Sequence, residues 1–294
     1  MKYKLTEETR EVYGCTLHRI EALKDFGVVK KGEKGGWIEK EDNLSQIGNC
    51  WVYGNASVSG NAYICGNAKV CGNALVYGNV RVLENAYICD NAKVCGNAWV
   101  YGNAWVYGNA LVCDNAKVYG NADVYGDAKV CGNAKVYGNA LVCDNAKVYG
   151  NAYICGNAKV YENAWVYGNA LVAGNALVCG NAKVCGNAKV YGNARVYGYA
   201  TVCGDAVLCG DVNIRGDAEI CSNADYIVFK NWWSSGRYFI WTRSNNMWSV
   251  GCFYGTGEEL IAKAYKDSEL SGREYKRVVD YVESILSDEK GGEK

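Results

Sequence analysis

A single histidine limits the acid–base chemistry available to this 294-residue chain. The imidazole is the side chain that ordinarily titrates near neutral pH, so histidine is a frequent general base. His18 stands before the repeated part of the sequence, in a segment of mixed charged and apolar residues. We therefore interpret His18 as a structural residue and predict no catalytic residues.

Cysteines are the second group of chemically active side chains. Most of the 16 cysteines stand at one position of a six-residue repeat, where they alternate with tyrosine. Residues 18 apart would stack in columns, and stacking gives two runs of three consecutive thiols: Cys95, Cys113 and Cys131, and Cys185, Cys203 and Cys221. Stacked Cα atoms about 4.8 Å apart lie within disulfide range.

The alternation with tyrosine favours reduced thiols in a cytoplasm. It treats cysteine as a medium-sized side chain rather than as half of a cross-link, which leaves a disulfide as the less favoured alternative. A tetrahedral thiolate site needs ligands from several directions, whereas a straight column supplies one direction. The sequence therefore predicts no metal site and no cofactor.

An aromatic segment near the C-terminus is the third group. It interleaves aromatic residues with arginines: Trp232, Trp233, Arg237, Tyr238, Trp241, Arg243 and Trp248. Such residues can stack on bases or bind a protein partner. They can equally form the core of a small unit that has few aliphatic residues. We predict a protein-binding site here and keep the core as the alternative.

The repeat determines the elements that position these groups. Residues 118–123 read Val-Tyr-Gly-Asn-Ala-Asp, and this phrase recurs in register from about residue 50 to residue 224. Ala and Val stand two positions apart, so they point to one side of a strand, while the variable residue between them points outward. Gly-Asn forms the corner, because both residues tolerate positive φ. Each strand should have about three residues.

Three such sides close a triangle of 18 residues, which predicts an all-β solenoid of about ten coils. A narrow interior explains why alanine recurs, since a larger residue would meet the facing sides. Several outward positions are apolar: Trp99, Trp105, Trp165, Leu111, Leu141 and Leu171. So many exposed apolar residues favour side-by-side packing of rods, in a homodimer or homotrimer.

The hexad resembles the hexapeptide repeat of left-handed parallel β-helix proteins, with an aliphatic residue at one position and a small residue four positions later. The resemblance implies a left-handed coil. Residues 19–51, which include Gly-Gly-Trp-Ile-Glu and Asn-Leu-Ser, resemble the head of prophage-type and enteric hexapeptide-repeat proteins described as transferases. Many proteins of this class are acyltransferases that use a histidine in a cleft between neighbouring rods.

The two ends of the chain do not repeat. We predict an N-terminal cap over residues 1–43, a β-helix over 44–224 and an α+β unit over 225–294. In the last unit, residues 226–229, 237–243 and 247–252 read as strands, with turns at 234–236 and 244–246. Residues 256–259 and 271–274 each resemble a capping box that begins a helix. Residues 287–294 are polar and are expected to fray.

Charge and hydropathy argue against nucleic acids and membranes as partners of this chain. The chain has 31 basic and 31 acidic residues, whereas nucleic-acid binders carry a basic stripe, so nucleic acid is not an expected partner. No apolar run is long enough for a membrane span, and the first residues do not resemble a signal peptide.

These observations favour a non-catalytic β-helix protein that acts by binding or as a scaffold. The resemblance of the N-terminal segment suggests a phage or mobile-element accessory protein that blocks a host factor in the host cytoplasm. Two alternatives remain: an acyltransferase-like enzyme with its site at an interface, and a purely structural spacer.

Overall fold

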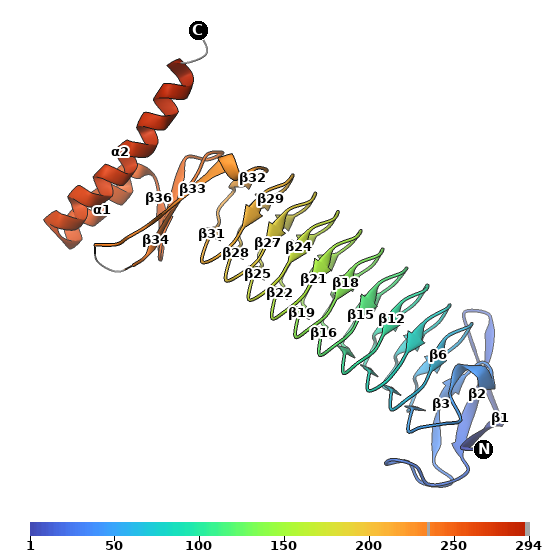
Figure 1. Cartoon of the computed structure of the whole chain (residues 1–294). Helices are drawn as coiled ribbons and strands as arrows, with labels where there is room; N and C mark the ends of the chain where they lie inside the picture. The colour runs from blue at the N-terminus through green and yellow to red at the C-terminus, as the bar shows by residue number, and fades with distance from the viewer. Residues whose placement is uncertain (234–235, 292–294) are drawn as a thin grey trace.

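The protein is a rod (Figure 1), and the computed structural model describes residues 1–233 and 236–291. N-terminal strands lie at one end, a parallel β-solenoid of about ten turns forms the shaft, and a small sheet with two helices covers the other end. The predicted solenoid and the α+β unit after it are confirmed.

The shaft consists of two-residue strands that recur every six residues, from β4 (Trp51–Val52) to β32 (Glu219–Ile220). Each contains the variable residue of a hexad and the aliphatic residue after it. Strands 18 residues apart pair in parallel, as β12 (Trp99–Val100) pairs with β15 (Lys117–Val118). The predicted 18-residue coil is therefore confirmed, although the strands are one residue shorter than expected.

The core of the shaft is a continuous column of valine and alanine. Val118 and Ala122 are fully buried, as are the residues at the same two positions in the neighbouring coils. The alanine position accepts valine twice, at Val80 and Val212, which lie near opposite ends of the shaft. Small residues are thus the rule inside the prism, and two valines are accommodated.

The corner corrects the expected role of asparagine. Positive φ falls on the glycine of the Gly-Asn pair, as at Gly120 (+73°), and no repeat asparagine among the described residues adopts it. The asparagines instead form ladders outside the core: the Asn103 Nδ2 donates to Asn121 Oδ1 at 3.0 Å, and Asn121 Nδ2 donates to Asn139 Oδ1 at 3.0 Å. Asparagine therefore stabilises the stacking of coils rather than the bend itself.

Five hexads carry an acidic residue at the positive-φ position: Glu84, Asp90, Asp114, Asp144 and Glu162. A left-handed backbone is unfavourable for residues with a Cβ. In four of the five, the carboxylate accepts a hydrogen bond from the backbone N–H 18 residues later. This contact between coils offsets the backbone strain and explains why acidic residues replace glycine there.

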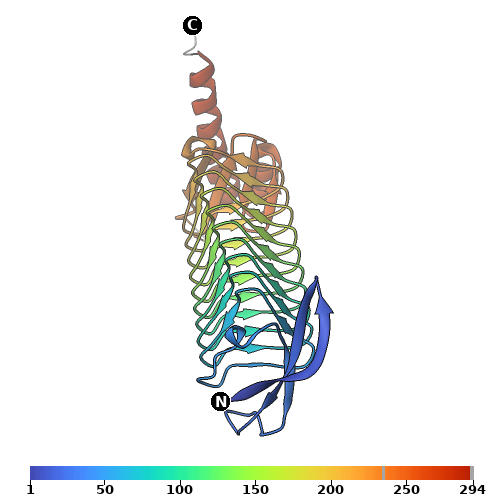
Figure 2. The same ribbon diagram turned by 90° about the vertical axis from the view of Figure 1, so that its right-hand side faces the viewer.

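The N-terminal strands precede the coils and begin with an antiparallel hairpin. Strands β1 (Tyr3–Val12) and β2 (Cys15–Ala22) form the hairpin, and β3 (Lys34–Ile38) joins it to the shaft by pairing in parallel with β5 (Ser57–Val58). Figure 2 shows the hairpin lying along one side of the rod.

The Gly-Gly-Trp-Ile-Glu motif lies where these strands meet the first coil. A Cβ on Gly35 would lie 2.6 Å from Ile20 Cγ1, and one on Gly36 would lie 2.6 Å from Val52 Cγ1. The two glycines are needed because β3 approaches the core of the shaft closely. Trp37 follows them, and Arg10 and Arg19 stack on its ring.

The C-terminal unit has four strands rather than the three that were predicted. They are β33 (Tyr226–Lys230), β34 (Tyr238–Thr242), β35 (Met247–Val250) and β36 (Phe253–Gly255), and they form an antiparallel sheet. The sequence suggested one strand over 247–252, but Gly251 has positive φ and turns the chain into β36. The predicted turn at Ser234-Ser235 lies outside the described residues.

Helix α1 (Gly257–Asp267) begins at the predicted capping box. Thr256 Oγ1 accepts from Glu259 N at 3.2 Å, and Glu259 Oε2 accepts from Thr256 N at 2.9 Å. The second helix, α2 (Glu269–Gly291), is present as predicted, but its predicted start at Ser271 is wrong, because the helix begins at Glu269. Ser268, the residue before the helix, accepts at its Oγ a hydrogen bond from Ser271 N in the first turn, at 3.0 Å.

Helix α2 also extends further than expected. Residues 287–291 continue the helix, so the predicted fraying from residue 287 is wrong for them, while residues 292–294 lie outside the described part. Glu289 is paired at 2.7 Å with Arg243, which follows β34, and this ion pair anchors the last turn of the helix. Of the described helices, neither has the length and apolar character needed to cross a membrane.

We expect the acidic corners to be sensitive to loss of the carboxylate. Asp144 has φ +56°, and its Oδ2 accepts from Glu162 N at 3.2 Å. Asp144→Ala keeps the unfavourable backbone and removes the acceptor, so it should lower the free energy of unfolding by about 1–2 kcal/mol. Asp144→Gly relieves the backbone and should change it by less than about 0.5 kcal/mol. Urea unfolding of both variants checks this, and equal midpoints for the two would contradict it.

Candidate functional site

The C-terminal sheet lies between the end of the shaft and the two helices. Alternate residues of β34 face opposite sides: Ile240 belongs to the core of the shaft, whereas Phe239 and Trp241 belong to a second core with α1 and α2. The sheet is joined to the last coils by polar contacts as well. Tyr226 Oη donates to Val207 O at 2.7 Å, and Asn245 Nδ2 donates to Asp217 Oδ1 at 2.8 Å.

This arrangement corrects the predicted binding site at two tryptophans. Trp241 and Trp248 are only 1% and 2% exposed, and both pack between the sheet and the helices. Trp233 is half-buried against the same core, where its ring contacts Phe239 and Tyr275. Because the unit has few aliphatic residues, the aromatic rings form its core, as the alternative interpretation proposed.

The two arginines and Tyr238 have partners within the chain. Arg243 is bonded to both carboxylate oxygens of Glu289, at 2.7 and 3.1 Å, and its guanidinium also lies over Trp241. Tyr238 packs against the core of the shaft. Arg237 is exposed, and its side chain lies beside Gly251. These contacts explain the position of each residue without a partner protein.

Trp232 differs from the other members of the segment. It is 82% exposed and contacts Trp233 edge to face, with ring centroids 6.0 Å apart. It lies close to Arg237, because Asn231 N donates to Arg237 O at 2.7 Å across the connection between β33 and β34. Of the seven predicted residues, Trp232 thus presents the large apolar surface that is free to bind a partner.

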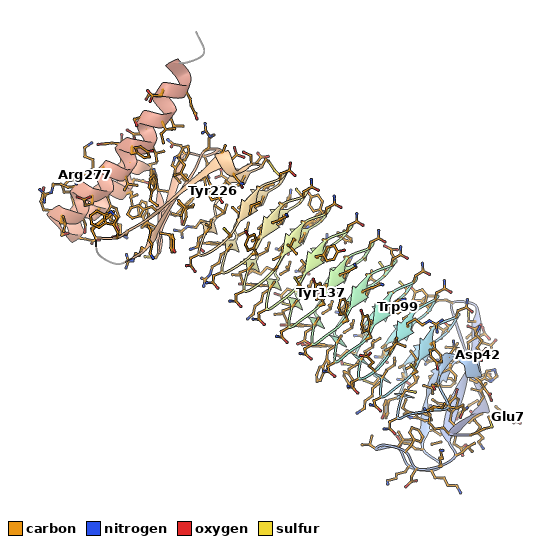
Figure 3. All side chains as sticks on the ribbon, in the orientation of Figure 1. Glu7, Asp42, Trp99, Tyr137, Tyr226 and Arg277 are labelled. Atoms are coloured by element: carbon orange, nitrogen blue, oxygen red, sulfur yellow. A yellow bond between two sulfur atoms is a disulfide. The ribbon has the colours of Figure 1, made fainter. Side chains whose placement is uncertain are left out.

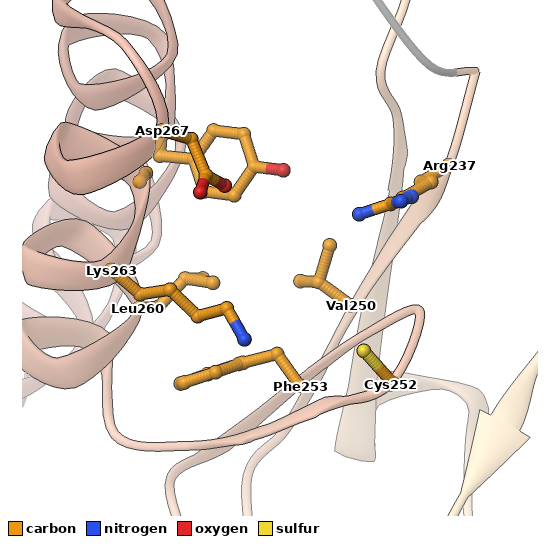
Figure 4. A pocket seen from close by; sticks show the side chains of 9 residues that line it. Arg237, Val250, Cys252, Phe253, Leu260, Lys263 and Asp267 are labelled. Atoms are coloured by element: carbon orange, nitrogen blue, oxygen red, sulfur yellow. The ribbon is translucent and has the colours of Figure 1, made fainter.

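A small cavity opens between β35, β36 and the helices (Figure 4). Lys263 and Asp267 of α1 face Arg237 and Phe253 across it. Its volume of about 20 Å³ has room for roughly one water molecule. The cavity is therefore too small for a substrate.

A wider groove lies under the N-terminal hairpin and was not anticipated from the sequence. The groove has a volume of about 430 Å³. It is lined on the hairpin side by Val12, Tyr13 and Cys15 and on the shaft side by Ser59 and Tyr77. The rings of Tyr13 and Tyr77 are 6.3 Å apart. No sequence signal predicted it, because it depends on how far the hairpin leans over the coils.

His18 lies in the hairpin and takes no part in this groove. It is half-buried in β2, with Nδ1 3.3 Å from Thr6 O of β1. His18 therefore lies in the N-terminal strands, outside the repeated coils.

The outward apolar residues are distributed over all three faces of the shaft. By strand pairing, Leu111 and Trp165 share one face, Trp99 and Leu171 a second, and Trp105 and Leu141 the third. Figure 3 shows Trp99 and Tyr137 projecting from the ladder. Trp105 is 50% exposed, whereas the leucines are half-buried by their neighbours. A single flat interface would therefore cover only two of the six residues.

The tyrosines and cysteines at the corners stack in the predicted columns. The rings of Tyr101, Tyr119 and Tyr137 are parallel, with centroids 4.8 and 4.9 Å apart. The hydrogen bond between Tyr137 and Cys155, followed by burial, raises the pKa of Tyr137 to about 12. Burial likewise raises the pKa of the Cys131 thiol.

One cysteine pair departs from the expectation of reduced thiols. Cys203 and Cys221 form a disulfide, with Cα atoms 4.3 Å apart. Parallel pairing of adjacent coils brings these residues together, as the column predicted. Cys185, the third member of that run, is a free thiol.

The unbroken hexads and the parallel solenoid fit the hexapeptide-repeat β-helix family of proteins. The model of a family described as "YdcK Beta solenoid repeat" matches residues 68–84, 92–108, 164–180 and 188–204. A protein of Escherichia coli (strain K12) named "Uncharacterized acetyltransferase YdcK" is 42% identical over 60 residues. That match covers 18% of this chain and 18% of the relative.

The burial of the aromatic residues leads to a stability prediction. Trp241→Ala empties a buried site and should lower the free energy of unfolding of the C-terminal unit by about 3–5 kcal/mol. Trp232→Ala removes an exposed ring and should change it by less than about 0.5 kcal/mol. Denaturant unfolding followed by near-ultraviolet circular dichroism measures both. A larger effect at Trp232 than at Trp241 would refute the assignment of core and surface.

Proposed function

We propose that this protein is a non-catalytic binding scaffold, a rigid rod that presents a partner-binding surface at its C-terminal end. The observation that carries the proposal is the exposure of Trp232 beside a folded aromatic core. A large aromatic ring held at the surface of a rigid unit is the kind of residue that dominates protein interfaces.

The build of the shaft supports the scaffold role. Every strand from β4 to β32 keeps the same step and pairs 18 residues apart, so the coils form one continuous ladder. Such a ladder resists bending and holds the N-terminal hairpin and the C-terminal sheet at a constant separation. A purely structural spacer would need this shaft alone, without the exposed tryptophan.

The proposal has two finer parts. The first is that the chain is a phage or mobile-element accessory protein that blocks a host protein, and it rests on the resemblance of residues 19–51. The second is self-association into a dimer or trimer, and it rests on exposed tryptophans such as Trp105. Since these residues lie on all three faces, a closed trimer would use more of them than a dimer would.

Affinity capture with matched variants tests the binding role. The wild-type chain should recover a stoichiometric partner from host lysate, and Trp232→Ala should weaken its binding by about thirtyfold, which corresponds to about 2 kcal/mol. Tyr199→Ala, which removes an exposed ring from the shaft, is the control and should bind normally. Equal recovery by both variants would place the partner elsewhere. Native mass measurement of the same samples reports self-association, and a monomer would refute that part.

Acyl transfer is the second candidate function, because the relative from Escherichia coli is named an acetyltransferase. Incubation with acetyl-coenzyme A and a panel of amines, followed by detection of released thiol, tests it. We expect no release above that of a heat-treated sample. Turnover that disappears in His18→Ala, with the fold unchanged by circular dichroism, would replace the scaffold proposal by an enzymatic one.

A further inference from the structure

One corner of the shaft carries the longest runs of cysteine. Successive coils place Ser59, Tyr77, Cys95, Cys113, Cys131, Tyr149, Tyr167, Cys185, Cys203 and Cys221 in a single column. In the run of Cys95, Cys113 and Cys131, the first cysteine is hydrogen-bonded to Tyr77, and Tyr149 follows the last one in the column. The pair that remains in the middle is Cys113 and Cys131, and both are free thiols.

A carboxylate joins this pair. One ligand atom from each of Cys113, Asp114 and Cys131 lies within 4.8 Å of the other two. Asp114 occupies the acidic corner position, with φ +59°, and its Oδ2 accepts from Gly132 N at 2.9 Å. The same oxygen lies 3.6 Å from Cys113 Sγ. The backbone of the next coil therefore holds the carboxylate beside both sulfurs.

The carboxylate supplies the direction that a straight thiol column lacks. The sulfurs of Cys113 and Cys131 lie along the column, and the carboxylate oxygen of Asp114 lies to one side of it, at the corner. Two sulfur ligands of a tetrahedral zinc ion lie about 3.8 Å apart, since each Zn–S bond is about 2.3 Å long. The ligand atoms of the cluster all lie within 4.8 Å of one another, which is close to this separation.

The sequence contains an internal comparison for this site. Residues 111–122 and 141–152 have the same twelve-residue sequence, Leu-Val-Cys-Asp-Asn-Ala-Lys-Val-Tyr-Gly-Asn-Ala. Cys143 and Asp144 thus repeat Cys113 and Asp114. The stacked neighbour differs, because the residue 18 positions after Cys143 is Tyr161 rather than a cysteine. The second thiol is a property of the stacking and not of the local sequence.

We propose that Cys113, Asp114 and Cys131 form a binding site for a thiophilic dication of the Zn²⁺ class, with the fourth ligand position open. Thiolate and carboxylate ligands together suit this borderline-soft ion better than Mg²⁺ or Ca²⁺, which prefer all-oxygen sites.

The electrostatics of the cluster agree with a cation. Three acceptor groups that repel one another when ionised are stabilised by a positive ion among them, and a coordinated thiol loses its proton to the solvent. In the second run of cysteines, by contrast, Cys203 and Cys221 form a disulfide beside Glu219, so their sulfurs are not available as thiolates.

The test compares the two identical segments. The full-length chain is kept under a non-thiol reductant and titrated with Cd²⁺, a spectroscopic substitute for Zn²⁺ whose thiolate complexes absorb in the ultraviolet. Zn²⁺ bound after desalting is counted by native mass spectrometry. Asp114→Asn and Cys131→Tyr should each lose one equivalent, or bind it at least about tenfold more weakly. Cys143→Ser and Asp144→Asn, at the matched positions, should retain it.

The substitutions are chosen to keep the fold, so that a loss of metal binding can be assigned to the loss of a ligand. Asn tolerates the positive φ of Asp114, and Cys131→Tyr reproduces the stacking found at Tyr161, so circular dichroism of both variants should match the wild type. Zn²⁺ should raise the melting temperature of the wild type and leave that of Cys131→Tyr unchanged. A wild type that retains no dication, a Cys113–Cys131 disulfide that persists under the reductant, or equal loss in the 143–144 variants would overturn the site.

Discussion

The structure depends on one repeated interaction, the parallel backbone ladder between coils. The outward residue, the tyrosine or cysteine and the asparagine of a hexad donate their N–H groups to carbonyls of the next coil, as Tyr119 N donates to Val136 O at 3.0 Å. The ladder runs without a break, so a residue's place in the hexad decides whether it lies in the core, on a face or at a corner. A slip of one residue would turn the valines outward, and burial of valine and alanine in every coil prevents it.

The ladder also places side-chain chemistry in columns. Residues that are 18 apart in sequence become neighbours, so tyrosines stack, asparagines bond to asparagines and thiols meet thiols. The identical segments 111–122 and 141–152 illustrate this. Cys113 stands above Cys131, whereas Cys143 stands above Tyr161. The local sequence is the same and the chemical environment is different, so a functional site can arise from the order in which nearly identical hexads are stacked.

A ladder of this kind leaves two ends that need cover. At the first end the chain uses β3 and a hairpin, with Gly35 and Gly36 admitting the close approach. At the other end the C-terminal sheet places one face on the shaft and the other on two helices. Trp241 and Trp248 are buried in that packing, whereas Trp232 stays exposed. Covering the end and presenting a binding surface are thus tasks of the same small unit.

The sequence by itself determined the period, the inward residues, the corners and the stacked columns, because a six-residue repeat imposes the same local geometry at every copy. Only the tertiary structure decided which corner residue takes positive φ, because the glycine and the asparagine are adjacent and both tolerate it. It also decided the start of α2, the strand β36 and the burial of the aromatic residues, since the ends have no repeat to guide them. The carboxylate of Asp114 beside two thiols was decided there as well, because it depends on contacts between coils.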